Sequence, residues 1–103
     1  MERRASLILK DGTILDGSGD PGYRADLVIE GDEITLLGDS GDLQAEQTLE
    51  CRGLTVCPGF IDTHSHSDLM LLKEPLASEK VMQGVTAELL GQDGIAVAPV
   101  RPE

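Results

Sequence analysis

The order of the apolar segments after residue 58 restricts the possible folds more than any other feature of this sequence. Residues 60–66 and 85–90 have strand character, and residues 75–83 have helical character, with Pro75 suited to a first turn and Gly84 to the position after the last. This order predicts a βαβ unit with parallel strands and a right-handed crossover. Because parallel sheets are normally extended by further units, we expect a truncated part of a larger α/β domain.

The residues before this unit carry a different pattern, in which short β-type runs are separated by turn residues. Strands are expected over residues 5–10, 13–15, 25–30, 33–37, 47–51 and 54–57. Asp11-Gly12 and Gly31-Asp32 each separate two of these runs, which predicts two hairpin turns. The sequence therefore predicts a small antiparallel β domain over residues 1–57 and a second domain over residues 58–103.

The composition bears on partners and compartment. The 103 residues include 19 acidic and 8 basic side chains, a formal charge of −11, which would repel the phosphates of nucleic acids and of anionic membranes. Ordinary solubility is the simpler explanation of this charge. Cys51 and Cys57 are not spaced as in a zinc ribbon or a redox pair, and no segment resembles a secretory leader. We expect a cytoplasmic protein with reduced thiols, and neither a nucleic-acid nor a membrane partner.

The only two histidines, His64 and His66, lie two positions apart in the expected strand 60–66. Strand periodicity places them on one face together with Asp62, and Ser65 on the other. Their Cα atoms would be about 6.6 Å apart, so both imidazoles could reach one zinc ion at ~2.1 Å. The alternative is a chance pattern of two surface histidines on an edge strand. The spacing favours a metal site because catalytic groups cluster at the carboxyl ends of strands in α/β barrels.

Residues 56–68 contain Pro-Gly-Phe-Ile-Asp-Thr-His-Ser-His and resemble the PGFIDxHxH signature of the amidohydrolase superfamily, in particular its N-acyl-D-amino-acid deacylase branch. Residues 10–22, 84–86 and 91–99 are also similar to that branch. The resemblance implies a small β domain formed by both chain termini and a (β/α)8 barrel whose mouth holds one or two zinc ions. Residues 1–57 would supply the N-terminal share of the β domain, and residues 58–103 would begin the barrel.

The resemblance also implies roles for individual residues. His64 and His66 correspond to a metal-binding pair, and Asp93 stands where deacylases often carry a cysteine ligand. A carboxylate also binds zinc, at ~2.0–2.2 Å, although Asp93 before a glycine is equally typical of a turn. Asp68 is expected either to orient a ligand imidazole or to cap residues 69–73. Glu88 alternates with its strand neighbours, and the sequence does not determine which face it occupies.

The implied reaction is zinc-dependent hydrolysis of the amide bond of a small N-acyl amino acid. The general base and further ligands belong to later strands in the family, so the 103-residue chain by itself is expected to be inactive. Two alternatives stay open. One is another amidohydrolase activity, such as a dihydroorotase, a hydantoinase or an isoaspartyl dipeptidase. The other is a non-catalytic metal-binding fragment whose unpaired strand edges promote self-association.

Overall fold

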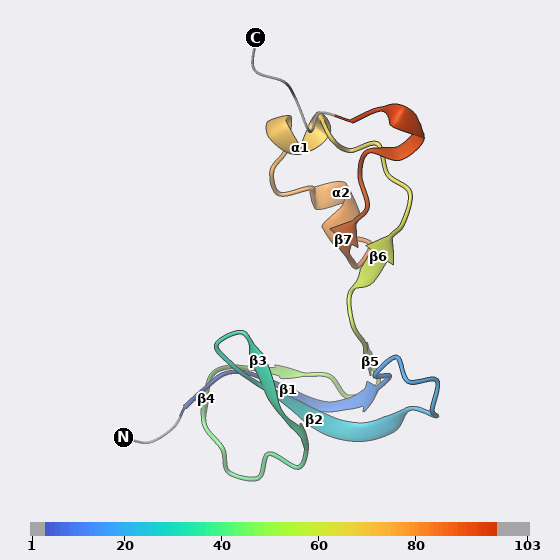
Figure 1. Ribbon diagram of the computed structural model, residues 1–103. Helices are drawn as coiled ribbons and strands as arrows, with labels where there is room; N and C mark the ends of the chain where they lie inside the picture. The colour runs from blue at the N-terminus through green and yellow to red at the C-terminus, as the bar shows by residue number, and fades with distance from the viewer. Residues whose placement is uncertain (1–3, 97–103) are drawn as a thin grey trace. The chain divides into compact units, whose positions relative to one another are not determined.

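The computed structural model describes residues 4–96, and the chain divides into two compact units between Pro58 and Gly59 (Figure 1). Residues 97–99, the end of one segment that resembles the deacylases, lie outside the described residues. None of the helices in the described range is long and apolar enough to cross a membrane.

The first unit is a mixed five-stranded sheet. It consists of β1 (Ala5–Ile14), β2 (Tyr23–Glu30), β3 (Glu33–Gly38), β4 (Ala45–Glu50) and β5 (Thr55–Val56). The order is β3-β2-β1-β4, and β5 also pairs with β1. The predicted hairpin at residues 31–32 is present, because β2 and β3 are antiparallel and Gly31 has a φ of 64°. The prediction of an all-antiparallel sheet is wrong, since β4 and β5 both run parallel to β1.

The predicted turn at Asp11-Gly12 is instead a bulge within one long strand. β1 continues from residue 5 to residue 14, and its register with β2 shifts between Leu9 and Gly12. Asp11 has a φ of 60°, which aspartate tolerates better than most residues. A Cβ on Gly12 would lie 2.7 Å from Val56 Cγ2, so glycine allows β5 to approach β1. The Asp-Gly pair therefore serves strand packing and not chain reversal.

The hydrophobic core of the first unit is small. Ala5, Ile8 and Val28 are almost fully buried, and Ile8 pairs directly with Val28 across β1 and β2. Leu36, Leu43 and Ala45 pack against them and are partly buried. The core therefore joins β1 and β2 to β3, to β4 and to the loop before β4.

The second unit contains the predicted pair of parallel strands. Its elements are β6 (Phe60–Asp62), α1 (Met70–Lys73), α2 (Ser78–Val81), β7 (Val85–Glu88) and η1 (Gln92–Gly94). β6 and β7 are parallel, as predicted. The helix expected over residues 75–83 is only the single turn α2, because Ala77 before it has a left-handed φ of 44°. The strand expected over residues 60–66 ends at Asp62.

The Pro-Gly step before β6 has a steric reason. A Cβ on Gly59 would lie 2.0 Å from Thr86 Oγ1 and 2.3 Å from Thr86 Cγ2 in β7. The Phe60 N–H donates to the carbonyl oxygen of Gly84 at 2.8 Å, and this bond begins the pairing of the two strands. Only glycine at position 59 lets β6 and β7 lie this close together.

Candidate metal centre

Three side chains from the carboxyl ends of β6 and β7 meet in the second unit. Nε2 of His64 lies 3.0 Å from Oδ2 of Asp93, and Nε2 of His66 lies 3.2 Å from the same oxygen. The two imidazole rings are 5.3 Å apart and inclined by 65°. The sequence places these residues 29 and 27 positions apart, and the parallel pairing of β6 with β7 brings the segments that follow the strands to one edge. The three residues predicted from the sequence thus form one cluster.

The periodicity argument that joined the histidines to Asp62 is wrong in its details. Because β6 ends at Asp62, His64 and His66 lie in the irregular segment after the strand. Asp62 does not face the cluster, since its Oδ1 accepts the backbone N–H of His64 and its Oδ2 accepts Lys80 Nζ. Ser65, between the histidines, is buried, with 4% of its surface exposed. The histidines converge because the segment curves around Ser65.

The backbone around Asp93 is held in an unusual conformation. Asp93 has a φ of 56°, and Gly91 and Gly94 beside it have φ values of 76° and 74°. The Gln92 side chain donates to the carbonyl oxygen of Thr63 at 3.4 Å and to that of Leu89 at 3.2 Å. Asp93 is therefore both the turn residue and the cluster member that the sequence offered as alternatives. A residue other than glycine in the left-handed conformation costs free energy, and such residues are typical of functional segments.

The donor set fits a zinc ion. Ligands of one tetrahedral zinc at ~2.1 Å lie about 3.4 Å apart, close to the spacing of the two nitrogen–oxygen pairs. Imidazole nitrogens and carboxylate oxygens are both common zinc ligands. The three side chains are about half exposed, at 56%, 46% and 63% for His64, His66 and Asp93, which leaves room for further ligands. In the metal-free chain the same distances let imidazole N–H groups donate to the Asp93 carboxylate, which keeps the three side chains together.

A second group of charged residues connects the strand ends. Sequence reasoning identified Asp62 and Glu88 but missed Lys80, which joins them. Lys80 Nζ lies 2.6 Å from Asp62 Oδ2 and 3.1 Å from Glu88 Oε1. The ion pair with Lys80 and the backbone N–H of His64 hold the pKa of Asp62 below its usual value. Burial opposes the ionisation of Glu88, but hydrogen bonds from Lys80, Ser65 and Ser67 outweigh burial and lower its pKa. Bonds to Asp62 and then Glu88 raise the pKa of Lys80, so all three groups are charged at neutral pH.

Asp68 takes neither of its predicted roles. α1 begins at Met70, the N-cap position before it is occupied by Leu69, and no side chain caps that helix. Oδ2 of Asp68 is buried and has no hydrogen-bond partner among the described residues. The predicted cap is therefore absent from the described structure.

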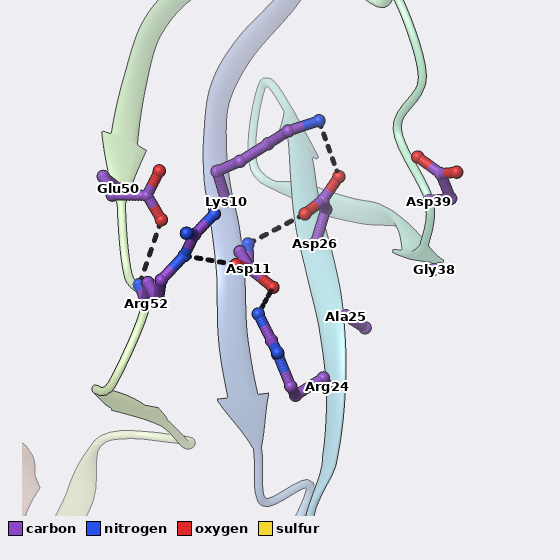
Figure 2. A pocket seen from close by; sticks show the side chains of 9 residues that line it. All are labelled: Lys10, Asp11, Arg24, Ala25, Asp26, Gly38, Asp39, Glu50 and Arg52. Carbon is purple, nitrogen blue, oxygen red and sulfur yellow. Dashed lines mark hydrogen bonds and ion pairs between the residues drawn. The ribbon is translucent and has the colours of Figure 1, made fainter.

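The first unit contains a pocket of about 470 Å³ that is lined by charged residues of β1, β2 and β4 and of the segments after β3 and β4 (Figure 2). Arg24 and Arg52 both pair with Asp11, the latter at 2.8 Å, and Lys10 pairs with Asp26 at 3.0 Å. Burial opposes ionisation of Asp26, but hydrogen bonds from the hydroxyl and N–H of Ser40 and from the Asp11 N–H hold its pKa far below the usual range. These charges are paired with one another and hold the β1 bulge, so their role in the described structure is structural.

Comparison with known proteins gives consistent matches along nearly the whole chain, although no protein-family model matches it. The chain is 46% identical over 94 residues to a D-aminoacylase of Alcaligenes xylosoxydans xylosoxydans. This match covers 91% of this chain and 19% of the relative. A solved D-aminoacylase with a binuclear metal centre superposes with a TM-score of 0.87 at 41% identity, over 93% of this chain and 20% of that chain.

The N-acyl-D-glutamate deacylase of Bordetella bronchiseptica, solved with zinc and a phosphonate that mimics the tetrahedral intermediate, superposes with a TM-score of 0.89 at 36% identity. The match covers 93% of this chain and 20% of that chain. The chain thus spans about a fifth of the length of the proteins that it matches.

Proposed function

Since this chain belongs to the D-aminoacylase branch of the amidohydrolases, we propose that it forms part of a zinc-dependent enzyme that hydrolyses N-acyl-D-amino acids. In this proposal residues 1–57 contribute to a small β domain, and residues 58–103 begin a (β/α)8 barrel. The observation that carries the proposal is the convergence of His64, His66 and Asp93, whose ligand atoms all lie within 4.8 Å of one another.

The three residues would hold zinc together with ligands from parts of the enzyme beyond this chain. Zinc, when bound, lowers the pKa of a water molecule to about 7 and polarises the amide carbonyl. The ring nitrogens of His64 and His66 would provide two ligands, and the Asp93 carboxylate would provide a third that favours a cation. The bent segment around Ser65 aims both imidazoles at one point, and Gln92 fixes the loop that carries Asp93.

Substrate recognition and proton transfer are assigned to residues outside this chain. Amide hydrolysis needs a group that collects a proton from water and delivers it to the leaving amine. His64, His66 and Asp93 are ligands in this proposal and are not available for that role. We therefore expect the 103-residue chain, supplied with zinc, to hydrolyse no N-acetyl-D-amino acid. A different amidohydrolase activity, on a cyclic amide or a dipeptide, is the alternative outcome for the complete enzyme.

The metal role is tested by titrating zinc into the whole chain in a calorimeter. Binding of one zinc per chain is expected, with loss in the His64→Ala, His66→Ala double variant and at least a tenfold weaker Kd in Asp93→Ala. Asp42→Ala, which changes an exposed turn carboxylate of the first unit, is the matched control and should bind as the wild type does. Equal binding by all four proteins would show that the cluster is not a metal site.

The catalytic role is tested in a chimera. The matching 94-residue segment of the Alcaligenes D-aminoacylase is replaced by the corresponding segment of this chain. We expect the chimera to hydrolyse N-acetyl-D-amino acids and the His64→Ala, His66→Ala chimera to lose that activity. A folded, zinc-loaded chimera that hydrolyses no N-acetyl-D-amino acid would contradict the proposal that this segment supports the deacylase reaction.

A further inference from the structure

The charged group formed by Asp62, Lys80 and Glu88 has a direct connection to the candidate ligands. Lys80 belongs to α2, in the crossover between the strands, whereas Asp62 ends β6 and Glu88 ends β7. The lysine ammonium group therefore binds the ends of both parallel strands. The side chains of Lys80, Asp62 and Glu88 are 26%, 27% and 10% exposed, so the group is largely shielded from water.

Both carboxylates that Lys80 binds also accept hydrogen bonds from the segment that carries the histidines. Oδ1 of Asp62 accepts the backbone N–H of His64 at 3.1 Å. Oε1 of Glu88 accepts the hydroxyl groups of Ser65 and Ser67, each at 3.0 Å. The two serines flank His66, so the backbone is held on both sides of that ligand. The two hydroxyl oxygens lie only 2.8 Å apart, which draws the segment into a tight bend.

Two further hydrogen bonds hold this bend, from the Ser65 N–H to the Leu89 carbonyl oxygen at 3.3 Å and from the Gln92 side chain to the Thr63 carbonyl oxygen at 3.4 Å. The second unit adds little side-chain packing to them. Ser65 is its only buried side chain among the described residues, and the remaining buried side chains lie in the first unit. Without the ammonium group, the carboxylates of Asp62 and Glu88 would repel each other. A metal site requires its ligands to be held within about 0.5 Å of the productive geometry.

We propose that Lys80 is a positioning residue for His64 and His66, acting through Asp62 and through Glu88 with its two serines. The proposal rests on the proposed metal function for its consequence, but the positioning itself is a property of the metal-free chain. Lys80 touches neither the candidate ligands nor a substrate, so its effect is on where the imidazoles lie.

The experiment measures ¹⁵N relaxation order parameters of the His64 and His66 amides in the metal-free chain, followed by zinc affinity of the same samples. Lys80→Met removes the charge and keeps the aliphatic stem. The Ser65→Ala, Ser67→Ala double variant keeps the Lys80 ion pairs and cuts their link to His66. Lys73→Met, at an exposed position of α1, is the matched control.

We expect the order parameters to fall from about 0.85 to below about 0.6 in Lys80→Met. The serine variant should lose order at His66, and Lys73→Met should match the wild type. Zinc Kd should rise about 10–100-fold in Lys80→Met and in the serine variant. Wild-type order parameters in Lys80→Met, with β6 and β7 still paired, would overturn the proposal whatever happens to zinc affinity.

Two further outcomes are also decisive. If the wild-type chain binds no zinc but the order parameters fall as expected, the metal function fails and the positioning role of Lys80 stands. If Lys80→Met unfolds the second unit, the serine variant decides, and unchanged order at His66 would overturn the proposal.

Discussion

The sheet unit and the unit after it bury their side chains to very different extents. All the buried apolar side chains of the described residues, including Ile8 and Val28, lie in the first unit. The second unit leaves large apolar side chains in solvent, among them Leu72 at 76% and Leu76 at 79% exposed. Its internal ties are instead the strand pairing of β6 with β7 and the ion pairs of Lys80.

This difference indicates which unit depends on further structure. Apolar side chains that follow a βαβ pattern and remain exposed are typical of a sheet whose neighbouring strands are missing. The candidate ligands lie in this less self-sufficient unit, so the proposed chemistry depends on residues that the chain does not contain. The first unit has a core of its own and contributes no candidate ligand.

The largest expected effect separates the two units by their cores. Ile8→Ala, at a position 2% exposed, should destabilise the first unit by about 2–5 kcal/mol, because it opens a cavity between β1 and β2. Leu72→Ala, at an exposed position, should change stability by less than about 0.5 kcal/mol. Urea unfolding is followed for the first unit by fluorescence of Tyr23, the only tyrosine in a chain without tryptophan, and for the second by its amide signals. An equal loss of stability in both variants would mean that the Leu72 side chain is buried in solution.

The next effect concerns the second unit, and is expected from Gly59→Ala. The new methyl group would meet the Thr86 side chain, so the pairing of β6 with β7 should lose about 1–3 kcal/mol. Amide hydrogen exchange at Phe60 measures the loss. Gly38→Ala, whose Cβ would make an ordinary contact at 3.6 Å, is the control. The Gly59→Ala, Thr86→Gly double variant should recover part of the protection, and no recovery would contradict the steric explanation.

A smaller effect, limited to the first unit, is expected from pH. The folded-state pKa of Asp26 is below the unfolded value, so its contribution is present above about pH 4 and is lost as the pH falls further towards the folded pKa. Asp26→Asn should lower the free energy of unfolding by about 1–2 kcal/mol at pH 7. It should also make that free energy less sensitive to pH between about 5 and 2, a range that includes the unfolded pKa of aspartate. Urea midpoints across this range test it. Asp32→Asn, in the exposed β2–β3 turn, is the matched control.

The smallest effect is expected at the exposed ion pairs of the pocket in the first unit. Arg52→Ala removes a side chain that is 73% exposed and pairs with Asp11, which keeps Arg24 as a second partner. Exposed pairs contribute little, so the melting temperature should change by less than about 2 °C. A larger loss in a thermal melt would show that the pocket holds the β1 bulge more strongly than its exposure suggests.

Local patterns predicted those features that neighbouring residues decide. The alternation around Gly31-Asp32 predicted the β2–β3 hairpin, and the order of apolar runs after residue 58 predicted two parallel strands. The spacing of His64 and His66, with the resemblance at Asp93, predicted three residues that the structure brings together. The strand periodicity used for the histidines was nevertheless wrong, since a bend around Ser65 and not a continued strand aims them.

Other features depended on contacts between distant residues. Asp11-Gly12 suits a hairpin turn and a bulge equally, because both structures accommodate a residue with a positive φ. The close approach of Val56 to Gly12 and the hydrogen bond from the Asp11 N–H to Asp26 select the bulge. The direction of β4 is likewise invisible in its side-chain alternation, since parallel and antiparallel pairing present the same faces.

The sequence by itself determined the type of each main segment, the parallel βαβ order and the residues of the candidate metal site, because these follow from periodicity, turn chemistry and a long motif. Only the tertiary structure decided the mixed sheet, the bulge in β1 and the place of Lys80 between Asp62 and Glu88. These depend on which distant strand ends meet. The sequence gives the charge and polarity of each side chain, but only folding decides which distant side chain becomes its partner.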